Sequence, residues 1–194
     1  MTMAADLNLT ETIEHSRRLL KERRDEDNLE FLEAAIERFP ADPEVRLLYA
    51  TALVPFQPDK APWQIATAIQ LDPDDPWRLT RAARLLFDLG ELDASRSYAA
   101  RASQLAPEDF TFESELANLG GKLAALDGHD ALAEEALRAA LESEPSEEVF
   151  ARDLAEFLAE RGRLGDALAV IDESLGRVQD REGLLRLRDS LVER

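Results

Sequence analysis

The stretch that decides the fold is residues 76–109, which read PWRLTRAARLLFDLGELDASRSYAARASQLAPED. Two runs rich in Ala, Leu and Arg, which are residue types that favour helices, lie on either side of Gly90, and Pro107 follows the second run. A glycine suits the left-handed residue that ends a helix, and a proline cannot continue one. The stretch therefore predicts a hairpin of two helices within 34 residues.

The same pattern of helix-ending residues recurs along the chain. The prolines that end comparable segments are Pro40, Pro73, Pro107 and Pro145, at spacings of 33, 34 and 38 residues. One further step of 34 residues reaches Gln179, which follows another apolar segment. Regular recurrence at this length indicates stacked helical hairpins.

Three other sets of positions lie at fixed distances from the residues that end the segments, which we call the terminators: Pro40, Pro73, Pro107, Pro145 and Gln179. A glycine lies 17 residues before the last three of them, at Gly90, Gly128 and Gly162. The position eight residues before each terminator is apolar and mostly bulky: Leu32, Ile65, Ala99, Leu137 and Ile171. The position five residues before is small: Ala35, Ala68, Ala102, Ala140 and Ser174. Small residues let two helices approach closely, so we expect these columns to pack inside the hairpins.

These columns resemble the tetratricopeptide repeat (TPR), and the resemblance extends over about residues 9–181. Within residues 76–109, the positions that match the family's packing face, turn, second helix and terminator are Leu79, Ala82, Ala83, Leu86, Gly90, Ala102 and Pro107. The resemblance implies an all-α fold, namely a right-handed α-solenoid of about five TPR-like helical hairpins plus a C-terminal capping helix.

The corresponding domain organisation has three parts. We expect a flexible N-terminus at residues 1–8, an array at 9–181 and a capping helix at 182–194. The units of the array are about 9–42, 43–75, 76–109, 110–147 and 148–181. Leu184, Leu187 and Leu191 share one face of the last helix, which favours covering of the final hairpin, with a dimerisation helix as the alternative.

Some units depart from the pattern. The second lacks the turn glycine and carries three prolines within residues 54–62, which predicts an enlarged loop between its helices. The fourth is four residues longer than the third. Aligning Asn118-Leu119-Gly120 with the family's first helix puts about three extra residues near Phe110-Thr111-Phe112 and one near Asp127-Gly128-His129. The first unit has His15 and Ser16 at packing positions, as in a degenerate terminal repeat.

Composition limits the classes of function. The 194 residues include 41 acidic and 23 basic side chains, so the net charge of -18 disfavours nucleic-acid binding. The absence of Cys excludes disulfides and thiolate sites. We expect a cytoplasmic protein with no membrane span, because no apolar run approaches about 18 residues and residues 1–8 have no signal-peptide pattern. Arg supplies 20 of the 23 cations and Ala is abundant, which suggests a bacterial source.

The resemblance also implies where a ligand would bind, because the first helices of TPR units line a concave groove. The implied peptide-binding residues are Leu47, Leu48, Thr51, Trp77, Arg81, Arg84, Phe87, Asn118 and Arg152. Arg could pair with ligand carboxylates. The alternative is that Arg81 and Arg84 pair with Asp88 or with acids of adjacent units, and that Trp77 packs on Phe110 or its neighbours. The family's clamp for the carboxylate of chaperone tails is not expected, because only one of its five positions matches in either register.

The function favoured by these patterns is a non-enzymatic scaffold or adaptor that binds a peptide or a partner domain in the groove. Gly-rich phosphate loops and the HExxH and GxSxG motifs are absent, and His129 in an acidic turn offers too few ligands for a metal, so no cofactor, metal or catalytic residue is expected. The alternatives are binding of a basic partner by the acidic surface, self-assembly as a homodimer through the last helix or the loop at Phe56, and the repeat region of a larger protein that contains a catalytic domain.

Overall fold

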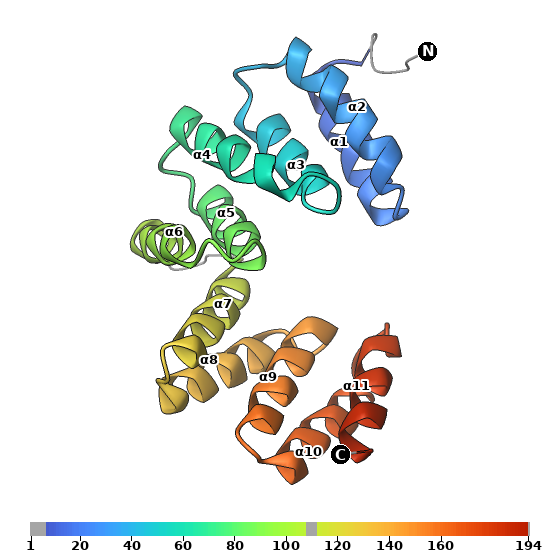
Figure 1. The fold of residues 1–194 in the computed structure, drawn as a ribbon, viewed down its shortest axis with the longest axis vertical. Coiled ribbons are helices and arrows are strands. Elements are labelled where there is room, and N and C mark those ends of the chain that lie inside the picture. The colour runs from blue at the N-terminus through green and yellow to red at the C-terminus, as the bar shows by residue number, and fades with distance from the viewer. Residues whose placement is uncertain (1–6, 108–111, 194) are drawn as a thin grey trace. The chain divides into compact units, whose positions relative to one another are not determined.

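The computed structural model describes residues 7–107 and 112–193. Within these residues the chain forms eleven α-helices, one short 3₁₀ helix and no strand (Figure 1). The elements are α1 Leu9–Lys21, α2 Asp25–Arg38, α3 Pro43–Leu53, η2 Pro58–Lys60, α4 Ala61–Leu71, α5 Pro76–Asp88, α6 Leu92–Leu105, α7 Glu113–Leu126, α8 Asp130–Ser143, α9 Glu148–Glu160, α10 Leu164–Ser174 and α11 Glu182–Val192. The all-α prediction is confirmed. The predicted flexible segment 1–8 lies mostly outside the described residues.

Local sequence explains where the helices begin. The Asp75 carboxylate accepts hydrogen bonds from the amides of Trp77 and Arg78, and Pro76 opens α5, where a missing amide hydrogen is harmless. Asp42 caps α3 in the same way, ahead of its own proline. These repeated Asp-Pro starts follow directly after the proline-terminated hairpins, so only a few residues separate one hairpin from the next.

Left-handed residues turn the chain between the two helices of a hairpin. Gly90, Gly128 and Gly162 have φ of +78°, +75° and +76°, as the glycine column predicted. Arg23 occupies the matching place between α1 and α2 at φ +55°, a conformation that costs a residue with a Cβ about 1–2 kcal/mol. The glycine column did not extend to this turn. Between α3 and α4 the proline-rich segment forms the enlarged loop that we predicted, with η2 inside it.

The fourth hairpin corrects the sequence alignment by one residue. A Cβ on Gly121 would lie 2.8 Å from Cγ of Leu137 and 3.0 Å from the carbonyl oxygen of Ala133, whereas a Cβ on Gly120 would meet nothing within 4 Å. Gly121 is therefore the residue at the close contact between α7 and α8. The alignment of Leu119-Gly120 was wrong because it followed the Leu-Gly dipeptide, and only the packing distinguishes the two glycines.

The same shift removes the extra residue that we placed near Asp127-Gly128-His129. The helix after Gly128 begins two residues later, as it does after Gly90 and Gly162, so this turn contains no insertion. Three of the four additional residues of the fourth unit therefore precede its first helix, and the fourth lengthens α7, which has 14 residues where α5 has 13. The part of that segment at Phe110 and Thr111 lies outside the described residues.

The chain divides into two compact units, residues 1–105 (unit 1) and 106–194 (unit 2). In unit 1, successive helices of the three hairpins pack together. The apolar core between α1, α2 and α3 includes Leu32 and Ala35. In unit 2, the core contains Leu137 and Ile171. Every residue of the apolar and small columns read from the sequence is buried, which confirms that these columns build the cores.

The last helix completes unit 2. α11 contacts both α9 and α10 (Figure 1), and Leu184 and Leu191 are buried against that hairpin. Leu187 is half-buried on the same side. The prediction of a C-terminal capping helix is confirmed, because the apolar face of α11 is used within its own unit.

Candidate protein-binding surface

In unit 1, the first helices of successive hairpins contact one another: α1 touches α3, and α3 touches α5. We call the linked side chains of Arg17, Glu44 and Arg81, together with the accessible Thr51, Trp77, Arg84 and Phe87 of the same helices, the first-helix face of unit 1. The helices α3 and α5 carry seven of the nine predicted groove residues, and the other two, Asn118 and Arg152, belong to unit 2. The predicted groove residues are therefore divided between the two units.

An ion-pair chain crosses the first-helix face of unit 1. The carboxylate of Glu44 on α3 accepts hydrogen bonds from Nη1 of Arg81 on α5, at 2.7 Å to Oε1 and 2.9 Å to Oε2. It also accepts a hydrogen bond at Oε1 from Nη2 of Arg17 on α1, at 2.9 Å. The side chains of Glu44 and Arg81 are only 16% and 28% exposed, so water screens this contact less than a surface pair. Three consecutive repeats thus place one carboxylate between two guanidinium groups.

This environment moves the pKa of Glu44. Burial raises the pKa of the carboxyl, but the charges and hydrogen bonds of Arg81 and Arg17 together outweigh it, and the net pKa lies below the ordinary value of 4.5. The folded state therefore holds the charged form more strongly than the unfolded chain does.

We expect the contribution of Glu44 to stability to depend on pH. Since the folded pKa is the lower one, the contribution is complete above the ordinary value of 4.5 and is lost as pH falls through the folded value. Urea unfolding of the wild type and of Glu44→Gln at several pH values would check this. The difference between their free energies of unfolding should be largest near neutral pH and shrink below 4.5; a constant difference would contradict it.

Arg84 also has a partner on its own helix. Its Nε lies 3.5 Å from Oδ2 of Asp88, four residues on. Together with the Arg81–Glu44 pair, this is the arrangement that we gave as the alternative to ligand contact, in which both arginines are paired with acids. Paired arginines can still receive a ligand, but the ligand must compete with Glu44 and Asp88.

The other predicted residues of unit 1 differ in accessibility. Trp77 is exposed at the start of α5, and Phe87 and Thr51 are half-buried. Leu47 and Leu48 are buried in the core of the hairpin and offer a ligand no surface. The alternative that placed Trp77 against Phe110 or its neighbours stays a prediction, because Phe110 itself lies outside the described residues.

Unit 2 presents polar side chains from α7 and α9, which are in contact. Nζ of Lys122 lies 3.4 Å from Oδ2 of the buried Asp153, and Nη1 of Arg152 lies 3.3 Å from Glu148. Asn118 is fully buried, and neither atom of its amide has a hydrogen-bond partner among the described residues. The two predicted residues of this unit are therefore an internal amide and a paired arginine.

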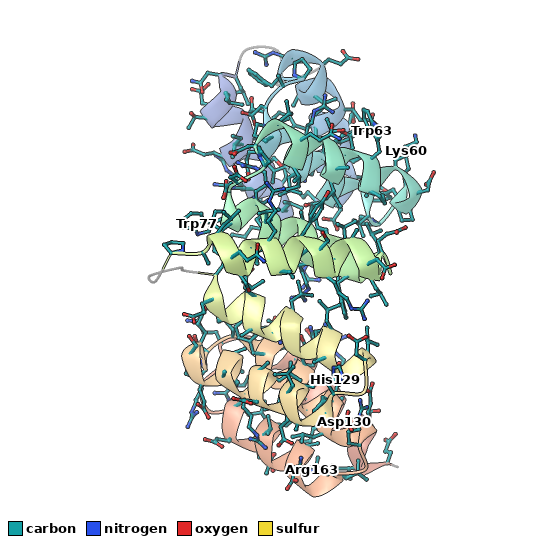
Figure 2. The ribbon with its side chains drawn as sticks, turned by 90° about the vertical axis from the view of Figure 1, so that its left-hand side faces the viewer. Lys60, Trp63, Trp77, His129, Asp130 and Arg163 are labelled. Atoms are coloured by element: carbon teal, nitrogen blue, oxygen red, sulfur yellow. The ribbon has the colours of Figure 1, made fainter. Side chains whose placement is uncertain are left out.

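The acidic side chains at and after the predicted turn at His129 are paired with arginines, which would compete with a metal ion for them. Asp130 accepts a hydrogen bond from Nε of Arg161 at 2.9 Å, and Nη1 of Arg163 lies 2.5 Å from Glu134. His129, Asp130 and Arg163 lie along one edge of unit 2 (Figure 2). Within the residues that the structure describes, no group of three His, Cys, Asp or Glu side chains is placed to hold a metal ion.

Arg17 and Glu44 were not among the residues predicted for this surface. The sequence did indicate that they could pair, because both occupy first-helix positions and carry opposite charges. They were missed because the groove residues were chosen for anchoring a ligand and not for pairing with each other.

Comparisons with known proteins identify the fold. No protein-family model and no curated protein matches the sequence. A thermophilic TPR protein of Thermus thermophilus superimposes with a TM-score of 0.78 at 22% identity, covering 94% of this chain and 98% of that one. PilW, a widely conserved type IV pilus biogenesis factor, gives 0.76 at 18% identity, covering 96% and 88%. PilF of Pseudomonas aeruginosa gives 0.69 at 17% identity, covering 94% and 82%.

The chain therefore has the tetratricopeptide-repeat fold, and the predicted TPR solenoid is confirmed. Fold similarity at these identities does not transfer the biological role of any of the three proteins. No helix among the described residues is long and apolar enough to cross a membrane.

Proposed function

We propose that this protein is a non-enzymatic interaction module that binds a peptide or a partner domain on the first-helix face of unit 1. The observation that carries the proposal is the convergence of Arg17 and Arg81 on Glu44, because it places basic groups from separate repeats on one side of the unit. A surface built across repeats can contact an extended ligand at several points.

Charge supports this choice of surface. Three arginines of the face, at positions 17, 81 and 84, accompany the two carboxylates of Glu44 and Asp88, in a chain whose net charge is -18. The face is thus locally cationic, and the exposed ring of Trp77 lies on the same helix as two of the arginines. A segment with apolar and acidic side chains fits this combination.

The test begins with a pull-down from native lysate to recover the partner, followed by measurement of its affinity. We expect Arg81→Glu with Arg84→Glu to weaken binding at least ~10-fold, because two attractive charges become repulsive at the contact. A matched control, Arg138→Glu with Arg163→Glu, makes the same change of charge in unit 2. Equal affinity of both variants, with the helical circular dichroism of each intact, would refute the assignment of this surface.

A second candidate rests on the charge of residues 110–147, which carry 9 acidic and 2 basic side chains. This part of the chain could attract a basic partner by long-range electrostatics. In that case affinity would fall steeply with added salt, and the Arg138/Arg163 double variant would change the affinity while the Arg81/Arg84 variant would not. The two candidates therefore give opposite results with the same pair of variants.

A further inference from the structure

The outward side of α4 differs from the rest of the chain. The helix, APWQIATAIQL, contains no charged side chain, although a third of the protein is charged. Trp63 is 64% exposed and Leu71 is 41% exposed, with half-buried Thr67 between them. The spacing 63, 67, 71 places these three residues on one face of the helix.

Trp63 is held in place from one side. The guanidinium carbon of Arg46 lies 5.7 Å from the centre of the Trp63 ring, and Arg46 itself donates to the carbonyl of Pro40 at 2.7 Å and to Oε1 of Gln64 at 2.9 Å. The ring is therefore positioned by a fixed cation while most of its surface remains open to solvent. Large aromatic side chains that are already ordered are the usual anchors of protein interfaces.

Charges of opposite sign flank this uncharged helix. Lys60 precedes it, donates to Oε1 of Gln57 at 2.5 Å and has no ion pair among the described residues. Lys60 and Trp63 project from the same end of α4 (Figure 2). Asp74 follows the helix, and its side chain is 69% exposed while it pairs with Arg101 of α6 at 2.6 Å.

We propose that the α4 stripe, defined as Lys60, Trp63, Thr67, Leu71 and Asp74, is a self-association surface that packs antiparallel against a second copy of this chain. The five positions are symmetric about Thr67, at offsets of 7 and 4 residues on each side. A two-fold axis at Thr67 therefore sets Trp63 beside the partner's Leu71. It also brings Lys60, at the start of α4, to the end of the partner's helix, where the partner's Asp74 lies in the turn that follows. Each contact occurs twice. This reciprocity is what an isologous interface requires.

The charge of the whole chain also favours this surface for a second copy. Two chains of net charge -18 repel each other, and the repulsion is smallest where the contact itself carries no net charge. The α4 stripe meets this condition, because Lys60 balances Asp74 and the three residues between them are uncharged. The surface is small, since a helix of eleven residues is only about 16 Å long. We therefore expect weak association, with half of the chains paired at roughly 10–100 µM.

The first experiment is sedimentation of the full chain over a series of concentrations. The wild type should shift from monomer to dimer, and Trp63→Ser should raise the dissociation constant at least ~10-fold. Leu126→Ser is the matched control, because Leu126 is 58% exposed but lies on α7; it should leave the dissociation constant unchanged. A wild type that stays monomeric up to about 1 mM, or a dimer insensitive to Trp63→Ser, overturns the proposal.

A charge exchange tests the pairing itself. Lys60→Glu and Asp74→Lys should each weaken the dimer several-fold, because each places two like charges opposite one another. The double variant should regain most of the lost affinity, since the ion pair between the copies is then restored with its two charges exchanged. The double variant also loses the Asp74–Arg101 pair, so recovery cannot come from contacts within one chain. Absence of recovery, with both single variants folded, would show that these positions do not meet.

Fluorescence gives an independent readout, since Trp63 and Trp77 are the two tryptophans of the chain. In Trp77→Phe the emission reports Trp63 alone. Its maximum should move to shorter wavelength as the concentration rises through the dissociation constant, because the partner removes water from the ring. An emission maximum that stays constant across the monomer–dimer transition would contradict burial of Trp63.

Discussion

Replacing Gly121 by Val is expected to lower the free energy of unfolding by about 2–3 kcal/mol, because it overfills the contact between α7 and α8. The new Cβ would lie 2.8 Å from Cγ of Leu137 and 3.0 Å from the backbone oxygen of Ala133. The leucine can change its rotamer, but the backbone oxygen belongs to a helix and cannot move without shifting α8. The gain in helix propensity from Gly to Val is at most about 0.5 kcal/mol and does not compensate.

The adjacent glycine supplies the control. Gly120→Val introduces the same side chain one residue earlier in the same helix, where nothing lies within 4 Å of the new Cβ. Its free energy of unfolding should stay within about 0.5 kcal/mol of the wild type. Both values can be measured by urea unfolding followed by circular dichroism. If Gly120→Val were the more damaging substitution, the alignment first read from the sequence would be right and the packing described for α7 would be wrong.

Reversing the charge of Glu44 should have an effect of similar size. In Glu44→Lys, Arg81 loses its carboxylate partner and a third cation enters between Arg17 and Arg81. Breaking a buried ion pair costs about 3–5 kcal/mol, and we expect about 2–3 kcal/mol here because these side chains are partly exposed. The free energy of unfolding at neutral pH, measured by urea unfolding, should fall by that amount.

The control for this substitution changes the total charge equally. Glu37 lies exposed on α2, and Glu37→Lys also makes the net charge two units more positive. Since it breaks no partly buried pair, its free energy of unfolding should change by less than about 0.5 kcal/mol. Equal losses in both variants would mean that net charge, and not the contact with Arg17 and Arg81, determines the effect.

Much of the fold could be predicted because its determinants are local. A glycine two residues before the second helix, a proline after it and small residues at a fixed offset each act within one hairpin, and repetition adds independent evidence for each column. The first turn escaped this prediction because Arg23 adopts the left-handed conformation without being a glycine. The strain at Arg23 is tolerated because the two helices on either side pack together, and no local pattern reports that.

The binding surface was harder to predict. The sequence placed Arg81 on the first-helix side of its repeat, but it could not show that the guanidinium meets a carboxylate 37 residues away. Leu47 and Leu48 occupy groove positions by alignment and are nevertheless buried, because the neighbouring helices of unit 1 close over them. Accessibility at such positions depends on how closely adjacent repeats pack, which varies with the side chains of both repeats.

By itself the sequence determined that this chain is all-α, that it repeats a helical hairpin, and which columns form the cores, because helix propensity, turn residues and periodic packing positions are local properties. Only the tertiary structure decided which of two adjacent glycines lies at the α7–α8 contact, and that Glu44 joins Arg17 and Arg81 across three repeats. Both depend on distances between residues far apart in the chain, which are set by the packing of whole helices.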